Sequence, residues 1–156
     1  MKEHNHIFRI IIVDDNADDI DLLGEAVKEV NLPLEIVPFT DGAQAFDYLR
    51  QGHSADLVIA DVNMPLISGI ELLNKISKDP TLSQVQLALT SGSSQGKLPA
   101  SITDGASFPY LCKSPDWSGY LRLAREIYDC LLSRGHDSGK TANAKPLVSL
   151  MRRSST

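Results

Sequence analysis

The chain has 156 residues, of which 42% are hydrophobic and 22% are charged, with a net charge of −5 at pH 7. These values are typical of one globular domain with a core of its own. No apolar run approaches the roughly 20 residues that a membrane helix needs. The short apolar run near the N-terminus ends in two acids, unlike a signal peptide. We therefore expect neither a membrane segment nor a secretory signal.

The charge is divided unevenly along the chain. Residues 135–156 hold four basic side chains and one acid, so residues 1–134 carry −8. An acidic body argues against direct binding to nucleic acid. The small, polar and basic composition of 135–156 predicts a flexible tail after a domain at 1–134. Cys112 and Cys130 have neither metal-site spacing nor a disulfide framework, which favours reduced thiols and a cytoplasmic protein.

Apolar segments alternate with amphipathic ones from residue 8 onward, which predicts strands alternating with helices. The expected strands are 8–13, 34–39, 57–60, 85–89 and 107–112. The expected helices run from Asn16 to Asn31, over 43–50, from Gly69 to Asp79, in a short or irregular form after Pro99, and over 117–132. Pro38 suits an edge strand. This pattern predicts a doubly wound α/β fold with a parallel sheet and helices on both faces.

The segment at 57–65, LVIADVNMP, is the most informative stretch. Its apolar run does not alternate with polar residues, as expected for a strand buried on both faces of a parallel sheet. Asp61 follows at the carboxyl end, where ligands and reactive groups gather in open α/β sheets. A carboxylate at this point is a helix cap, a metal ligand or a nucleophile.

Polar residues also end the other predicted strands. Asp14 and Asp15 follow the first strand, Thr90 the fourth and Lys113 the fifth. The carboxyl ends of parallel strands share one edge, so these residues are expected to meet Asp61. Converging carboxylates repel one another, and hard oxygen ligands suit Mg²⁺. A hydroxyl and an ammonium group beside them are suited to phosphoryl oxygens.

Five motifs follow one another along the chain: IIVDDN, DVNMPLISG, Thr90 after an apolar strand, DGAS at 104–107, and Lys113 preceded by Tyr110. Together, and in this order, they resemble a response-regulator receiver domain of two-component signalling. The resemblance covers residues 7–133 and implies a flavodoxin-like sheet of order 2-1-3-4-5. DNADDIDLL, TDGAQAFDYLRQG and ISKDPTLSQV further resemble stand-alone regulators paired with phytochrome-like histidine kinases.

The resemblance implies a role for each residue that matches a motif. Asp61 would be the phosphoacceptor. Asp15 would bind Mg²⁺ directly and Asp14 mainly through water, while Asp61 and the backbone carbonyl of Asn63 would complete the metal ligands. Lys113 would pair with Asp61 before the reaction and with the phosphoryl group after it.

Two further residues would form the switch. Thr90 would move inward to donate to a phosphoryl oxygen, and Tyr110 would swing from an exposed to a buried position. The implied function is a stand-alone regulator that receives a phosphoryl group from a histidine kinase or phosphotransfer protein and binds a downstream protein. It implies no enzyme activity on other substrates and leaves a homodimer open. Each residue also has a plainer interpretation: the acids as helix caps, Thr90 as a turn residue, Lys113 as a surface lysine and Tyr110 as a core aromatic.

The pattern is broken in three places. Receivers usually have proline directly after the lysine, whereas Ser114 follows Lys113 here. A cis bond before a residue other than proline costs about 2.5–4 kcal/mol, so this loop is either trans and rearranged or strained. Ser91 stands where a small apolar residue is common, and residues 93–106 are rich in glycine, serine and proline. The altered junction keeps open an adaptor that no longer needs phosphorylation. A second alternative is a Mg²⁺-dependent phosphatase or phosphotransferase that uses Asp61 on an external substrate.

Overall fold

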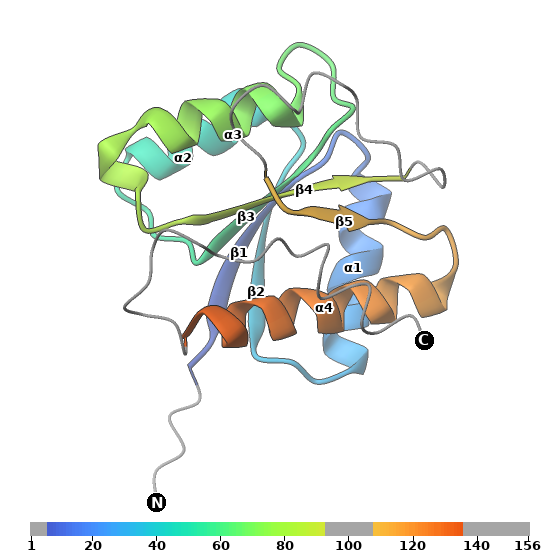
Figure 1. The fold of residues 1–156 in the computed structure, drawn as a ribbon. Coiled ribbons are helices and arrows are strands. Elements are labelled where there is room, and N and C mark those ends of the chain that lie inside the picture. The colour runs from blue at the N-terminus through green and yellow to red at the C-terminus, as the bar shows by residue number, and fades with distance from the viewer. Residues whose placement is uncertain (1–5, 93–107, 136–156) are drawn as a thin grey trace, which may run out of the picture.

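The computed structural model describes residues 6–92 and 108–135, and this part of the chain contains a five-stranded parallel sheet (Figure 1). The strand order is β2-β1-β3-β4-β5, which confirms the predicted doubly wound sheet. β1, β3 and β4 lie in the interior, and β2 and β5 lie at the edges. The strands are β1 (Phe8–Val13), β2 (Leu34–Phe39), β3 (Leu57–Asp61), β4 (Gln86–Ser91) and β5 (Tyr110–Cys112).

Helices cover both faces of the sheet, with α1 and α4 on one face and α2 and α3 on the other (Figure 1). They are α1 (Ala17–Glu29), α2 (Gly42–Arg50), α3 (Gly69–Lys78), the short 3₁₀ helix η1 (Pro80–Leu82) and α4 (Trp117–Gly135). None of the helices in the described ranges has the length and hydropathy to cross a membrane. The helix expected after Pro99 and the tail at 136–156 lie outside the described residues.

The unbroken apolar runs have a direct structural reason. Side chains along a strand point alternately to its two faces. In β1, Ile10 and Ile12 pack under α1 and α4, while Ile11 and Val13 pack under α2 and α3. Every residue of β3 is buried. Two cores therefore flank the sheet, and burying each large side chain contributes about 1.5–3 kcal/mol.

Side-chain caps fix where the first three helices begin. The Asn16 carboxamide accepts a hydrogen bond from the Asp18 amide at 3.0 Å, and the Asp41 carboxylate accepts one from the Ala43 amide at 2.8 Å. The Ser68 hydroxyl accepts one from the Glu71 amide at 3.2 Å. Caps of this kind contribute about 1 kcal/mol each. The cap at Asn16 anchors the loop that carries Asp14 and Asp15, and the cap at Ser68 ends the loop that follows Asp61.

The last two strands differ from their expected bounds. β4 continues to Ser91, because Thr90 and Ser91 pair with residues of β5. β5 begins only at Tyr110. The Pro109 carbonyl accepts a hydrogen bond from the Leu89 amide at 2.8 Å, but proline has no N–H to return to the ladder.

Candidate functional site

Three carboxylates meet at the carboxyl edge of the sheet. β1 pairs with β3 through Val13 and Ala60, which places Asp14 and Asp61 side by side at the ends of neighbouring strands. Asp14 is 3% exposed and Asp61 is 7% exposed, whereas Asp15 points toward solvent. One carboxylate oxygen from each of the three lies within 4.8 Å of the others. The structure thus brings together the acids that the sequence predicted to converge.

Lys113 supplies the positive charge at this edge. It directly follows β5, and its amide donates to the Ser91 carbonyl at 2.9 Å, which continues the ladder with β4. The Lys113 ammonium lies 2.6 Å from Asp14 Oδ2 and 3.4 Å from Asp61 Oδ2. Its side chain is only 12% exposed, so it is not a solvated surface lysine.

Burial and charge oppose each other in the protonation of these groups. Burial raises the pKa of Asp61 above its ordinary value, and the nearby Lys113 charge counteracts only part of this effect. Burial alone would lower the pKa of Lys113. The hydrogen bond to Asp14 and the charges of Asp61 and Asp14 outweigh burial, so the pKa of Lys113 is raised and its ammonium stays charged at neutral pH.

The donor chemistry of this cluster fits a hard divalent cation. Asp14, Asp15 and Asp61 offer carboxylate oxygens, which are the ligands that Mg²⁺ prefers in proteins. Asn63, whose backbone carbonyl was predicted as a further ligand, is two residues beyond Asp61, and its amide donates to Asp61 Oδ1 at 3.1 Å. That hydrogen bond fixes the Asp61 carboxylate against the loop after β3.

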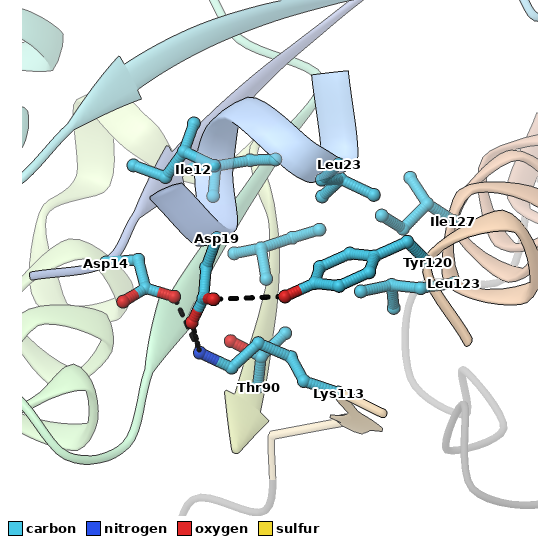
Figure 2. A pocket seen from close by; sticks show the side chains of 11 residues that line it. Ile12, Asp14, Asp19, Leu23, Thr90, Lys113, Tyr120, Leu123 and Ile127 are labelled. Atoms are coloured by element: carbon cyan, nitrogen blue, oxygen red, sulfur yellow. Dashed lines mark hydrogen bonds and ion pairs between the residues drawn. The ribbon is translucent and has the colours of Figure 1, made fainter. Parts of the chain in front are cut away.

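Thr90 lies on β4, the strand next to Asp61, and Tyr110 lies on β5, one strand further out. Thr90 is paired with Asp61 in the ladder between β3 and β4, and its carbonyl accepts a hydrogen bond from the Val62 amide at 2.9 Å. Thr90 also lines a hollow together with Asp14 and Lys113 (Figure 2). Tyr110 is 7% exposed and packs in the core under α2 and α3. The structure therefore holds Tyr110 in a buried position.

Two residues of the site were missed in the sequence. Asp19 Oδ2 lies 3.1 Å from Lys113 Nζ, and the Tyr120 hydroxyl donates to Asp19 Oδ1 at 3.0 Å (Figure 2). Asp19 lies in the first turn of α1, where acids are common because they favour the helix N-terminus. Tyr120 matches the apolar face of α4. The two residues are 101 positions apart, and no local signal in the sequence links them.

The Lys113–Ser114 junction is trans, since the described residues contain no cis peptide bond. The loop after it leads directly into α4. The Asp116 carboxylate accepts hydrogen bonds from the Ser114 hydroxyl and the Gly119 amide, both at 2.9 Å. A β-carbon at Gly119 would overlap the Ser114 side chain. Glycine at 119 thus leaves the space that the Ser114 side chain occupies, and Lys113 still reaches the carboxylates.

Removing the Asp61 charge is expected to stabilise the metal-free protein. Asp61→Asn should raise the free energy of unfolding at pH 7, because the fold disfavours the ionised carboxylate. The folded pKa lies above the ordinary value of about 3.9, so the wild type takes up a proton as the pH falls. The gain in the free energy of unfolding is complete above the pKa of Asp61 in the folded protein and disappears as the pH falls toward about 3.9.

Urea unfolding of the wild type and Asp61→Asn at several pH values checks this, with the exposed Asp47→Asn as the control. A gain that does not change with pH would contradict the expectation.

Comparison with known proteins gives one family. The sequence model of the response regulator receiver domain family matches residues 10–116 of this chain. Among solved structures, the phosphorylated cyanobacterial phytochrome response regulator RcpA is 29% identical, with a TM-score of 0.68 over 83% of this chain and 96% of that chain. The regulator TrrA of Thermotoga maritima, solved in complex with Mg²⁺-BeF, is 28% identical, with a TM-score of 0.61 over 78% of this chain and 97% of that chain.

Curated relatives match over part of their length. The 3′,5′-cyclic-nucleotide phosphodiesterase regA of Dictyostelium discoideum is 33% identical over 54% of this chain and 10% of its own length. A protein-glutamate methylesterase/protein-glutamine glutaminase of Shewanella is 28% identical over 90% of this chain and 40% of its own length. This chain thus spans a tenth to two fifths of these relatives. From the matched residues 10–116, together with the fold, the chain belongs to the response regulator receiver domain family.

Proposed function

We propose that this chain is a phosphorylation switch that accepts a phosphoryl group on Asp61 and then acts by binding a downstream protein. The observation that carries the proposal is the buried Asp61 carboxylate, 3.4 Å from Lys113 Nζ and within 4.8 Å of carboxylate oxygens of Asp14 and Asp15. Phosphoryl transfer needs positioning and charge neutralisation, and little else from the protein. The proposed activity is limited to the chain's own phosphorylation and dephosphorylation.

The transfer itself is a simple exchange of bonds. One oxygen of Asp61 attacks phosphorus and forms a P–O bond. The bond from phosphorus to the nitrogen of a phosphohistidine, or to the acyl oxygen of acetyl phosphate, breaks, and its electron pair leaves with the donor. Lys113 donates hydrogen bonds to the phosphoryl oxygens. Asp15, Asp61 and the backbone carbonyl of Asn63 would hold Mg²⁺ directly and Asp14 mainly through water, and the ion would supply further positive charge.

The switch is proposed to involve Thr90 and Tyr110. Phosphorylation adds about −1.5 to −2 charges at Asp61, and Thr90 on the adjacent strand would donate its hydroxyl to a phosphoryl oxygen. The ladder pairing of Thr90 with Asp61 supports this role. Tyr110 would swing from an exposed to a buried position on phosphorylation, and in the structure described here, which carries no phosphoryl group, it is already buried.

The proposed donor is a histidine kinase or a phosphotransfer protein. Likeness to the phytochrome response regulator RcpA makes a phytochrome-like histidine kinase the first donor to test. The matched region covers 96% of the RcpA chain, which supports a stand-alone regulator with a receiver domain at 1–134. The −8 charge of residues 1–134 supports a protein partner rather than nucleic acid. A cytoplasmic location belongs to the same proposal, and a homodimer is left open.

Intact mass spectrometry tests the proposal. The wild type is incubated with acetyl phosphate, with and without Mg²⁺, beside Asp61→Asn and the exposed control Asp47→Asn. The wild type and the control should each gain one phosphoryl group only with Mg²⁺, and Asp61→Asn should gain none. Transfer from a phosphorylated phytochrome-like kinase should label the same residue.

Two results would contradict the proposal. Addition to Asp61→Asn would place the phosphoryl group elsewhere. No addition to the wild type from acetyl phosphate or from phosphorylated kinases, with Mg²⁺ present, would favour an adaptor that works without phosphorylation.

A further inference from the structure

Lys113 has a third acidic partner outside the carboxylate cluster proposed to bind metal. Asp19 Oδ2 lies 3.1 Å from Lys113 Nζ, closer than Asp61 Oδ2 at 3.4 Å. The nearest partner, Asp14, lies at 2.6 Å. The two shorter contacts both come from the β1–α1 side of the site, so they hold the ammonium on that side and away from Asp61.

Asp19 is itself held in place by α4. Its second oxygen, Oδ1, accepts a hydrogen bond from the Tyr120 hydroxyl at 3.0 Å. Tyr120 is 6% exposed and packs among the residues of α1 and α4. Figure 2 shows the Tyr120 ring entering from α4 and the Asp19 carboxylate between the Tyr120 hydroxyl and the Lys113 ammonium. Asp19 is therefore bound at both oxygens.

We infer that Asp19 is a positioning residue that restrains Lys113 in the unphosphorylated state, and that Tyr120 holds Asp19 in place for this purpose. The inference rests on the proposed function, in which Lys113 turns to the phosphoryl group on Asp61. To do so, the ammonium weakens or leaves its charge-assisted hydrogen bond with Asp19. Asp19 thus opposes the phosphorylated state. The strength of its hydrogen bond to the Lys113 ammonium determines how readily that ammonium moves to the phosphoryl group.

The sign of this effect separates Asp19 from the other acids of the site. Loss of a metal ligand or of the phosphoacceptor should weaken binding of a phosphoryl group. Loss of the Asp19 charge should strengthen it, because Lys113 becomes available. The substitution Asp19→Asn keeps the shape of the side chain and an oxygen that can accept from Tyr120, so it changes the charge with little change in packing.

The test measures the affinity for beryllofluoride, a phosphoryl analogue, by calorimetry with Mg²⁺ present. Asp19→Asn should bind about three- to tenfold more tightly than the wild type, because its contact with Lys113 loses the charge that makes a charge-assisted hydrogen bond roughly twice as strong as a neutral one. The matched control is Asp18→Asn, an identical substitution one residue away at an exposed position of the same helix. Its affinity should equal that of the wild type.

A second readout needs neither metal nor phosphoryl group. The NMR signal of the Lys113 ammonium in the metal-free protein should shift in Asp19→Asn and stay in place in Asp18→Asn. Tyr120→Phe removes only the hydroxyl that holds Asp19. It should shift the Lys113 signal in the wild-type background and have no further effect in the Asp19→Asn background, because Tyr120 acts through Asp19.

The outcomes distinguish this inference from the proposed function. If the wild type is phosphorylated on Asp61 but Asp19→Asn binds beryllofluoride no more tightly than Asp18→Asn, the inference is overturned and the proposed function stands. A weaker affinity in Asp19→Asn would mean that Asp19 supports the phosphorylated state, and it overturns the inference as well. If the wild type neither binds beryllofluoride nor accepts a phosphoryl group, both fail.

Discussion

Lys113→Met is expected to lower the free energy of unfolding at pH 7 by about 3 kcal/mol, because it leaves a group of buried acids without its cation. The Lys113 ammonium lies within 3.4 Å of carboxylate oxygens of Asp14, Asp19 and Asp61. Methionine keeps most of the apolar stem and removes the charge. The variant should also lose most of its phosphorylation, since no ammonium group remains to pair with the phosphoryl oxygens.

Urea unfolding in the absence of divalent cations measures this loss. The matched control is Lys28→Met on α1, where the lysine side chain is 79% exposed and its ion pair with Glu25 spans 3.7 Å. That change should stay within about 0.5 kcal/mol. Adding Asp61→Asn to Lys113→Met should restore part of the lost stability by removing one of the repelling charges. A loss in Lys113→Met no larger than in Lys28→Met would contradict the arrangement described here.

The dependence on pH has a definite sign. The pKa of Lys113 is raised in the fold, so its contribution to stability is complete below the ordinary lysine pKa of about 10.4. This contribution is lost as the pH rises through the folded pKa. The difference between the wild type and Lys113→Met should therefore stay constant from neutral pH to about pH 10 and decrease above it.

The fold was predictable because its signals are local. The run at 57–60 is apolar without alternation, and the structure buries every residue of β3. Pro38 pointed to an edge strand, and β2 lies at an edge of the sheet. The strand order came from the resemblance to a family, and the structure confirms it. The bounds of β4 and β5 were less accurate, since they depend on pairing between strands distant in the chain.

The meeting of Asp14, Asp15 and Asp61 was predictable for a geometric reason. Asp61 is the last residue of β3, and Asp14 and Asp15 directly follow β1. Parallel strands end at one edge, so the sequence positions alone determine that these acids converge. Lys113 follows the last strand and meets them for the same reason. Asp19 and Tyr120 belong to helices, whose rotation about their axes determines which side chains face the site. That rotation depends on packing, and sequence spacing alone did not reveal the contact.

The junction after Lys113 shows how a broken pattern is accommodated. Ser114 left open a rearranged or a strained loop, and the described bond is trans. The adjustment lies at Asp116, which caps α4, and at Gly119, where a β-carbon would lie 2.7 Å from the Ser114 hydroxyl oxygen. Neither residue is conspicuous in the sequence, because the contact appears only when α4 is docked.

Gly69→Ala is expected to destabilise the protein by about 3 kcal/mol and to slow phosphorylation, because the new methyl group would displace Asp61. A β-carbon at Gly69 would lie 2.8 Å from the Asp61 carbonyl carbon and closer still to its oxygen, which is backbone that cannot rotate away. β3 is buried and paired on both sides, so it resists a shift of Asp61. The steric clash would therefore distort both the N-terminus of α3 and the position of the phosphoacceptor Asp61.

The matched control is Gly24→Ala inside α1, where an added β-carbon meets nothing within 4 Å. Alanine favours the helix there, so this variant should gain up to about 1 kcal/mol. Urea unfolding and the rate of acetyl phosphate labelling are measured for both variants. Equal stabilities would mean that the loop before α3 moves freely, and Asp61 would then be held by β3 alone. A large loss of stability together with slower labelling in Gly69→Ala would show that the α3 N-terminus and the end of β3 position the phosphoacceptor as one unit.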